Sequence, residues 1–189
     1  MTRFTFHDEH SAPQAAQPTM EQAKQAFGFV PNLVRGMANS PALAEGYLTL
    51  SGLYANTSLT PQEQQVALLA VSRYNGCDYC IAAHSMIAEM AQLSADAIQA
   101  LRDDRPIDDP KLEALRVFTT KMVDKRGWLD EADTQAFLDA GFDMQQVGDV
   151  ILAVGMKTLS NYFNHIARTP LDEAMNPYAW AGSAPAKQA

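Results

Sequence analysis

A sequence pattern that is typical of a helix N-terminus precedes the most apolar run of this chain. Thr60 is a good N-cap residue, Pro61 suits the first turn, and Glu63 falls where a capping box needs its carboxylate. Residues 66–71, a little further on, are apolar almost all round. A helix that is apolar on every side is normally buried, so we expect this helix to lie deep inside the fold.

The other segments also show helical patterns. In the last long segment, Val147, Val150 and Val154 recur at the spacing of one helix face. No segment shows sustained period-two alternation bounded by hairpin turns. We therefore predict an all-α fold of about seven helices. The sequence shows no repeat of fixed period and no internal linker, so a single domain is the simplest organisation.

The chain ends are expected to differ from this domain. Residues 1–18 contain Ser and Pro loop markers, and we predict an extended N-terminal arm. Phe4 and Phe6 would be exposed in such an arm, so we expect it to pack on a neighbouring subunit. Residues 19–176 are predicted to form the all-α domain, and residues 177–189 a C-terminal tail.

Composition and charge limit the partners. The 189 residues are 47% hydrophobic and 19% charged, with a net charge of −8, which is typical of a folded globular protein. An acidic chain is poorly suited to bind nucleic acid or an anionic membrane. There is no apolar run of the ~20 residues that a membrane span needs, and the N-terminus lacks the apolar core of a secretory signal. We expect a cytoplasmic protein.

Both cysteines of the chain lie in one short motif. Cys77 and Cys80 are three residues apart, and His84 follows four residues after the second. On a helix these three side chains share one face. In a reducing compartment such a pair is catalytic or metal-binding more often than a structural disulfide. The start of a helix near Cys77 and the imidazole beside Cys80 could each favour a thiolate. This pattern indicates Cys80 as nucleophile and Cys77 as resolving thiol.

Other interpretations of the motif remain. The cysteines could be small core residues without chemistry. They could also bind zinc with His84, which would require a fourth ligand from His7, His10 or His165. Covalent haem attachment is excluded because Ile81, not histidine, follows the second cysteine.

Three segments resemble a known family. Residues 70–84, with the sequence AVSRYNGCDYCIAAH, are similar to the core of the carboxymuconolactone decarboxylase and alkylhydroperoxidase D-like (AhpD-like) superfamily. They are most similar to its uncharacterised peroxidase-related branch. Residues 155–165 and 28–33 resemble the same branch, and the resemblance covers most of residues 25–172.

The resemblance implies a fold and an activity. The fold would be an AhpD-like helical bundle, with the Cys-x-x-Cys motif at the start of a central helix, assembled as trimers or hexamers. The activity would be that of a thiol-dependent peroxidase or disulfide reductase. Cys80 would be the peroxidatic residue, Cys77 the resolving residue, and His84 part of the proton relay. No cofactor and no metal are expected.

Two positions depart from the family pattern. Gln65 stands where well-studied members have a glutamate of the relay, and an amide cannot act as a carboxylate base. Tyr79 stands where they have a histidine, and a phenol is a poor base at neutral pH. Gln65 and Tyr79 are therefore candidates only for a supporting role. His165, on the last helix, could approach the thiols within the fold or across a subunit contact.

We therefore expect an oxidoreductase that cycles Cys77 and Cys80 between dithiol and disulfide. It would reduce hydroperoxides or a partner disulfide and would be regenerated by an external thiol. A cofactor-free lactone decarboxylase, suggested by the wider superfamily, is one alternative. A non-enzymatic oligomeric module that senses oxidation or binds zinc is the other.

Overall fold

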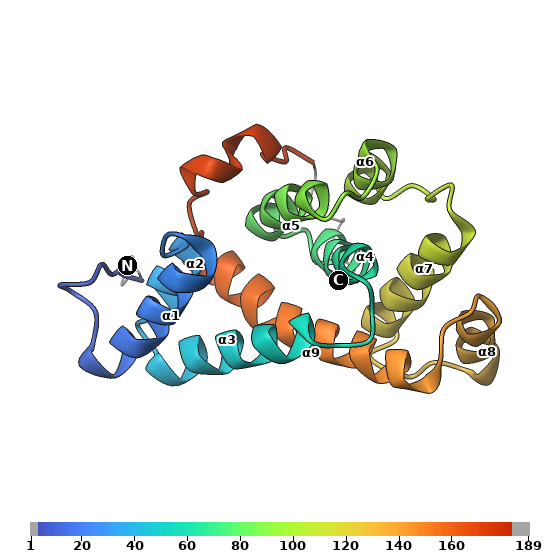
Figure 1. Cartoon of the computed structure of the whole chain (residues 1–189), viewed down its shortest axis with the longest axis horizontal. Coiled ribbons are helices and arrows are strands. Elements are labelled where there is room, and N and C mark those ends of the chain that lie inside the picture. Colours follow the sequence, from blue (N-terminus) through green and yellow to red (C-terminus); the bar gives the residue numbers. More distant parts are fainter. Residues whose placement is uncertain (1–3, 183–189) are drawn as a thin grey trace.

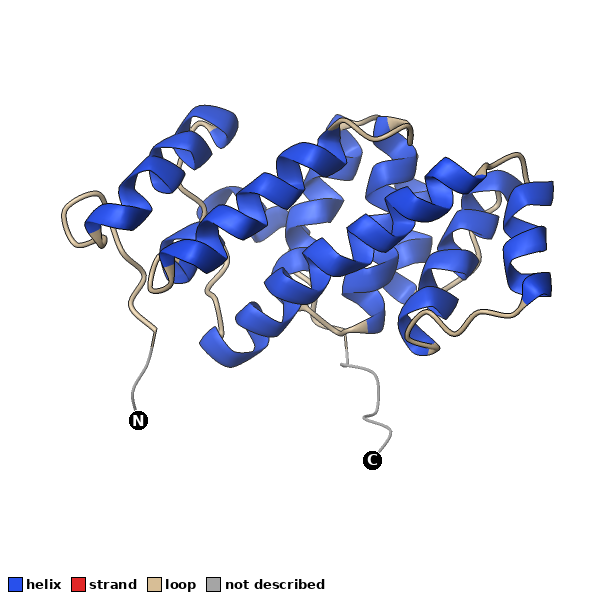
Figure 2. Cartoon of the chain, turned by 90° about the horizontal axis from the view of Figure 1, so that it is seen from below, coloured by secondary structure: helices blue, strands red, loops and turns tan. Residues whose placement is uncertain are grey.

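The structure is a computed structural model that describes residues 4–182, and over this range it consists of helices and loops without a strand (Figure 2). The prediction of an all-α fold is confirmed. Within residues 4–182, nine α-helices and two short 3-10 helices follow one another. The α-helices are Gln17–Phe27 (α1), Asn32–Met37 (α2), Pro41–Ala55 (α3), Pro61–Tyr74 (α4), Asp78–Met90 (α5), Ala95–Asp103 (α6), Pro110–Asp124 (α7), Glu131–Asp139 (α8) and Met144–Ala167 (α9).

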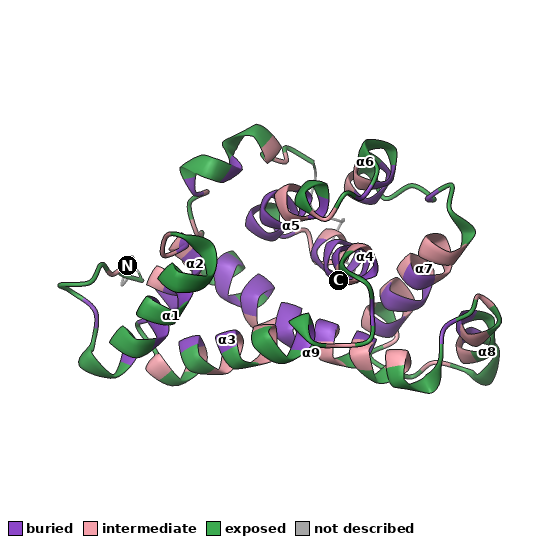
Figure 3. Cartoon of the chain, in the orientation of Figure 1, coloured by how far each residue is buried: buried purple, intermediate pink, exposed green. Residues whose placement is uncertain are grey.

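Helix α4 lies in the middle of the fold and packs against α5, α6, α7 and α9 (Figure 1). The predicted capping box is present: Thr60 accepts from the backbone N–H of Glu63, and the Glu63 carboxylate accepts from the backbone N–H of Thr60. Val66 and Val71 are fully buried, and every residue from 65 to 72 is buried; Figure 3 shows buried residues in α4 at the centre of the fold. The expectation of a deeply buried helix is confirmed.

Helix α9 links the two ends of the molecule and runs beside α3 (Figure 1). It begins with a capping box formed by Asp143 and Gln146. Its first half contributes Val150 and Ala153 to the main hydrophobic core around α4 and α7. Its second half contributes Phe163 to a smaller core that contains both cysteines. Because one continuous helix serves both cores, residues along its inner face reach the cysteine motif.

The N-terminal residues differ from the predicted arm. Helix α1 begins at Gln17, and a 3-10 helix at Gln14–Ala16 precedes it, so the arm is shorter and only partly extended. The Phe4 ring packs edge-on against Phe163, with ring centroids 4.9 Å apart. The α9 helix of the same chain thus provides part of the apolar surface for Phe4, which stays 38% exposed, and packing of the arm on a neighbouring subunit stays a prediction.

Two further segments were not predicted as helices. Residues Asn32–Met37 form α2, a short helix whose N-cap position is occupied by Pro31. Residues Glu173–Tyr178 form a second 3-10 helix, η2, which packs on α5. The predicted tail is ordered as far as it is described: Trp180 Nε1 donates to the carbonyl oxygen of Arg102 over 3.2 Å. Residues 183–189 lie outside the described part. Across residues 4–182, no helix combines the length and hydropathy of a membrane span.

Candidate active site

The cysteine motif begins at a tight turn between α4 and α5. Gly76 has a φ of 63°, in the left-handed region that favours glycine. Asn75 fastens this turn to α9 by donating from Nδ2 to Asn161 Oδ1 over 2.9 Å. Cys77 then occupies the N-cap position of α5, and Cys80 lies in the first turn of that helix. Both thiols are thus held beside backbone N–H groups at a helix start, where negative charge is favoured.

The two sulfur atoms are buried and touch polar side chains of α9. Asn164 Nδ2 lies 3.3 Å from Cys80 Sγ and 3.6 Å from Cys77 Sγ, so one amide group can donate to either sulfur. Ser160 Oγ lies 3.8 Å from Cys80 Sγ. Both cysteines are reduced. The polar contacts to Cys80 are those that a thiolate would accept.

A buried cation lies beside the motif. Lys157 is completely buried, one turn before Ser160 on the inner face of α9, and its charge acts on Cys80. Lys157 Nζ lies 2.9 Å from His84 Nε2. This lysine is not among the site residues predicted from the sequence. Its helical position could have indicated burial, since Lys157 stands seven residues after Val150 and therefore shares the apolar face of the helix.

His84 is held between two side chains. Gln65 Oε1 lies 3.0 Å from His84 Nδ1, while the Lys157 ammonium donates to Nε2. An acceptor on one side and a donor on the other fit a neutral imidazole that carries its proton on Nδ1. Burial, and then the Lys157 charge, lowers the pKa of His84 well below its ordinary value. These two contacts and the lowered pKa favour a neutral His84, and the positive charge beside Cys80 belongs to Lys157.

The two thiols have opposite proton affinities. Burial alone would raise the pKa of Cys80, but the hydrogen bond from the Cys77 thiol, the charge of Lys157 and the hydroxyl of Ser160 hold that pKa well below its ordinary value. The hydrogen bond to Cys80, followed by burial, raises the pKa of Cys77 above its ordinary value. The environment of the pair therefore favours the negative charge on Cys80 and the proton on Cys77.

The side chains of Tyr79 and His165 have other surroundings than the Cys80 sulfur. The Tyr79 hydroxyl donates to the Asp172 carboxylate and accepts from the backbone N–H of Leu33, so Tyr79 ties α5 to α2 and to the chain beyond α9. Burial and the Asp172 carboxylate raise the pKa of Tyr79. His165 is exposed and lines a cavity on the Cys77 side of the motif. Gln65 supports His84, but no side-chain hydrogen bond joins Tyr79 or His165 to Cys80 in the described part of the chain.

Each cysteine lines a different cavity. Cys80 lines a cavity of about 410 Å³ together with Gln65, His84 and Lys157. The rest of its wall is mostly apolar or aromatic; it includes Phe29, Leu33, Tyr47, Met86 and Met156. Cys77 lines a second cavity of about 430 Å³, whose wall is largely polar. An apolar molecule that enters the first cavity would meet the Cys80 thiolate and the Lys157 ammonium.

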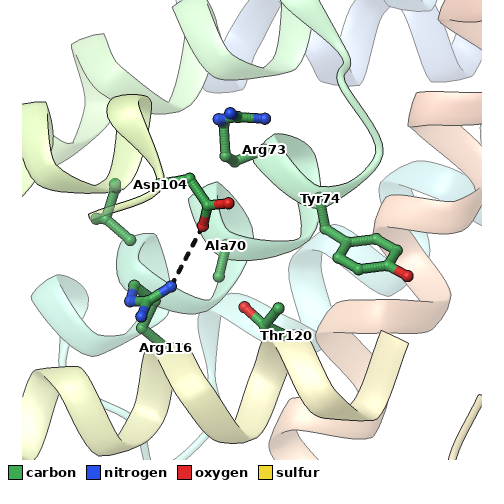
Figure 4. Close-up of a pocket in the computed structure, with 7 residues that line it drawn as sticks. Ala70, Arg73, Tyr74, Asp104, Arg116 and Thr120 are labelled. Atoms are coloured by element: carbon green, nitrogen blue, oxygen red, sulfur yellow. Dashed lines mark hydrogen bonds and ion pairs between the residues drawn. The ribbon is translucent and has the colours of Figure 1, made fainter. Parts of the chain in front are cut away.

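A third, much smaller hollow lies between α4, α6 and α7 (Figure 4). It holds about 20 Å³, and an ion pair of 3.4 Å between Arg116 and Asp104 crosses its wall. Its lining includes neither cysteine, so it is separate from the thiol site. Among residues 4–182, no three His, Cys, Asp or Glu side chains gather as ligands of a metal ion would.

Comparison with known proteins agrees with this fold. The chain matches the sequence model of the carboxymuconolactone decarboxylase family over residues 41–119, a span that includes both cysteines. A search of curated protein sequences gave no significant relative.

Solved structures share the architecture over nearly the whole chain. One is an uncharacterised peroxidase-related protein with an alkylhydroperoxidase AhpD core from Ralstonia eutropha JMP134, with a TM-score of 0.80, 20% identity, and coverage of 92% of this chain and 93% of that one. A peroxidase-related protein from Silicibacter sp. TM1040 gives a TM-score of 0.77 and 18% identity, covering 92% of each chain. A cysteine-to-alanine variant of the debrominase Bmp8, in complex with 2,3,4-tribromopyrrole, gives 0.76 and 19%, covering 94% of this chain and 96% of that one.

These findings define the protein as an all-α protein with the AhpD-like fold. Residues 41–119 match the carboxymuconolactone decarboxylase family, and residues 4–182 share the fold of the AhpD-like structures.

Proposed function

We propose that the chain is a thiol oxidoreductase that cycles Cys77 and Cys80 between dithiol and disulfide and reduces hydroperoxides. The observation that carries this proposal is the unequal environment of the two thiols. Lys157, Ser160 and Asn164 favour a thiolate at Cys80. Cys77, in contrast, favours the protonated form and donates a hydrogen bond to Cys80. A nucleophile and a thiol that can resolve its oxidation product thus lie side by side.

The first step would take place in the apolar cavity. The Cys80 thiolate attacks the terminal oxygen of a hydroperoxide, the O–O bond breaks, and Cys80 becomes a sulfenic acid. The leaving alkoxide takes up a proton and departs as an alcohol. Lys157 lines the same cavity as Cys80 and is placed to donate that proton. His84, which accepts from Lys157, would hold the ammonium in position.

The second step would use the neighbouring thiol. Cys77 attacks the sulfenic sulfur of Cys80, an S–S bond forms, and water leaves. Two equivalents of an external thiol then reopen the disulfide and are themselves oxidised to a disulfide. The same cycle, run from a partner disulfide instead of a hydroperoxide, would make the chain a disulfide reductase.

A hydroperoxide assay tests this proposal directly. With an organic hydroperoxide and excess dithiothreitol, the wild-type protein should consume the hydroperoxide, and Cys80→Ser should abolish the consumption. Cys77→Ser should still undergo one turnover and should accumulate a sulfenic acid that a dimedone probe labels at Cys80. Equal consumption by the wild-type protein and Cys80→Ser would refute the proposal.

Reductive dehalogenation is a second candidate, favoured by the aromatic and apolar wall beside Cys80 and by the debrominase among the structural neighbours. Here the Cys80 thiolate would take the halogen from an activated aromatic ring, and Lys157 would protonate the ring carbanion. Cys77 would then displace the halide and form the disulfide. Halide release from a brominated pyrrole, abolished by Cys80→Ser, would support this activity, and its absence would exclude it.

A lactone decarboxylase needs no thiol. Decarboxylation of a carboxymuconolactone that survives in a Cys77→Ser, Cys80→Ser double variant would favour that alternative over both thiol reactions. The substrate would then have to occupy the same apolar cavity, with Lys157 and His84 as its polar partners.

The proposed setting of the reaction is the cytoplasm, where thiol reductants maintain the dithiol. We propose a homo-oligomer, a trimer or hexamer as the family resemblance implies. Its partners would be a hydroperoxide or disulfide substrate and a thiol reductant, and neither nucleic acid nor a membrane would be bound.

A further inference from the structure

The two cysteines face opposite sides of the motif. Cys80 lines the apolar cavity with Lys157, whereas Cys77 lines the polar cavity with Asn164 and His165. A disulfide between the two sulfurs would therefore form part of two separate walls. A hydroperoxide can therefore reach Cys80 from one cavity, and a reductant can reach Cys77 of the disulfide from the other.

The chemistry of the second cavity is suited to a hydrophilic thiol. Arg168 and Asp78, both exposed, bring a positive and a negative charge to its wall. In residues 4–182 neither side chain forms an ion pair. His165 adds an imidazole, the side chain best suited to accept the proton of an incoming thiol.

The cavity wall also contains unused hydrogen-bonding atoms. Asn164 Oδ1 and Thr169 Oγ1 are buried without a hydrogen-bond partner in the described part of the chain. Asn164 is 5% exposed and lies against both sulfurs. Buried polar atoms are normally paired, so these two atoms point to a polar ligand in the cavity.

The better leaving group decides which sulfur of the disulfide is attacked. A thiolate that attacks a disulfide displaces the sulfur that is more stable as an anion. Cys80 is that sulfur, because Lys157, Ser160 and Asn164 lie beside it and favour its thiolate. Attack on Cys77 is therefore faster than attack on Cys80, and Cys77 is also the sulfur that lines the polar cavity.

We infer that the reductant enters the polar cavity and attacks Cys77, and that it is a small hydrophilic thiol bearing a carboxylate. Arg168 binds the carboxylate, and Asp78 binds an ammonium group where the thiol carries one, as cysteine and its peptides do. This inference rests on the proposed dithiol cycle and adds the class of reductant and the sulfur that it attacks. The cavity of about 430 Å³ suits a molecule of this size.

The reaction balances as two thiol exchanges. The donor thiol transfers its proton to His165, its thiolate bonds to Cys77 Sγ, the Cys77–Cys80 bond breaks, and Cys80 leaves as a thiolate. A second donor thiolate attacks the donor sulfur of the mixed disulfide, and Cys77 leaves and recovers a proton. Two donor thiols are oxidised to one donor disulfide, and the protein disulfide is reduced to a dithiol.

The test starts from protein oxidised with diamide, so it does not depend on hydroperoxide reduction. Oxidised protein is mixed with mercaptopropionate, quenched rapidly with N-ethylmaleimide, digested with trypsin and sequenced by mass spectrometry. Cys77 and Cys80 lie in one tryptic peptide, residues 74–102, and fragment ions separate them. We expect the donor on Cys77 and the maleimide on Cys80. The donor on Cys80, or failure of diamide to form the disulfide, would overturn the inference.

The charge selectivity is tested by comparing donors. Per thiolate, mercaptopropionate should open the disulfide faster than neutral mercaptoethanol. Arg168→Gln should reduce this preference by roughly two- to fivefold, as expected for an exposed charge pair. Arg126→Gln is a matched control, because Arg126 has a φ of 53° close to the 50° of Arg168 and does not line the cavity.

An unchanged preference in Arg168→Gln would overturn the assignment of the donor, as would a disulfide opened by a thioredoxin-type protein and by no small thiol. The outcome is separate from that of the proposed function. Loss of hydroperoxide turnover with the donor still on Cys77 would refute the peroxidase and leave this inference standing. Normal hydroperoxide turnover with the donor on Cys80 would overturn this inference and leave the peroxidase proposal standing.

Discussion

A single buried lysine explains how a site with few bases can still hold a thiolate. In place of a relay of carboxylate and histidine, Lys157 places its charge beside Cys80, while His84 and Gln65 fix the position of that charge. Gln65 cannot remove a proton, but here its task is to accept the Nδ1 proton of His84. The substitution of a glutamine at this position thus fits a neutral imidazole.

Removing this charge should slow the reaction. In Lys157→Met, the pKa of Cys80 should rise toward the ordinary thiol value of ~8.5, at which about 3% of the thiol is ionised at pH 7. We expect kcat/KM for hydroperoxide to fall at least about tenfold at pH 7. Apolar replacement of a buried charged group is often tolerated, so circular dichroism should show an unchanged fold.

Lys24→Met serves as the control, because Lys24 is exposed on α1 and lies far from the site in sequence. It should retain wild-type kcat/KM. An unchanged rate in Lys157→Met would show that the lysine does not sustain the thiolate.

Part of the site was predictable at the level of single residues. The spacing of Cys77, Cys80 and His84 predicted a shared helix, and the structure places all three at or within α5. Lys157 and Asn164 escaped prediction because they lie on α9, about 80 residues further along the chain. Sequence spacing does not show that α9 packs on α5. The cation beside His84 was not predicted for the same reason, and the part of His84 in a proton relay stays a prediction.

At the scale of elements, the turn between α4 and α5 sets the position of the thiols. Gly76 adopts a left-handed φ of 63°, directly before Cys77. A side chain at this φ costs about 1 kcal/mol. Gly76→Ala should therefore lower the free energy of unfolding by about that amount, and should reduce peroxidase activity because both sulfurs follow the turn.

Gly46 is a glycine whose replacement by alanine should stabilise the protein. It lies within α3, and a Cβ atom added there would meet nothing within 4 Å. Gly46→Ala should raise the free energy of unfolding by about 0.5–1 kcal/mol. Urea unfolding of both variants provides the measurement. Equal changes of the same sign would contradict the role assigned to the turn.

Helix starts were more predictable than short or context-dependent segments. Thr60, Ser94, Asp130 and Asp143 all act as N-caps whose side chains accept from the backbone. Helix α2 was missed, because Gly28 and Pro31 signal a break and six residues show no clear periodicity. The contact of Phe4 with Phe163 joins segments more than 150 residues apart, which local patterns cannot predict.

At the scale of the whole molecule, an exposed apolar stripe on α9 supports the proposal of a homo-oligomer. Ile151, Tyr162 and Ile166 are 55%, 58% and 74% exposed and share one side of the helix. Gly148 and Gly155, each with open space around it, lie near the same side. A second copy of the chain could therefore approach α9 closely and cover these side chains.

Light scattering tests this surface. The wild-type protein should have the mass of a trimer or hexamer, and Ile151→Glu combined with Tyr162→Glu should reduce it to that of a monomer. Trp128→Glu is the control, because Trp128 is 86% exposed but follows α7 and lies off the stripe. A wild-type monomer at all concentrations would contradict the oligomer, and an unchanged mass in the double variant would exclude this surface.

The central claim is that Cys80 is a thiolate at neutral pH and Cys77 is a thiol. Thiolate absorbance at 240 nm, titrated from pH 4 to 8.5 in the reduced protein, measures this directly without requiring a reagent to enter the cavity. We predict one thiolate per chain at pH 7 in the wild-type protein and in Cys77→Ser, and none in Cys80→Ser. Absorbance that appears only above about pH 8, near the ordinary thiol pKa, or that disappears with Cys77 instead of Cys80, would contradict the account.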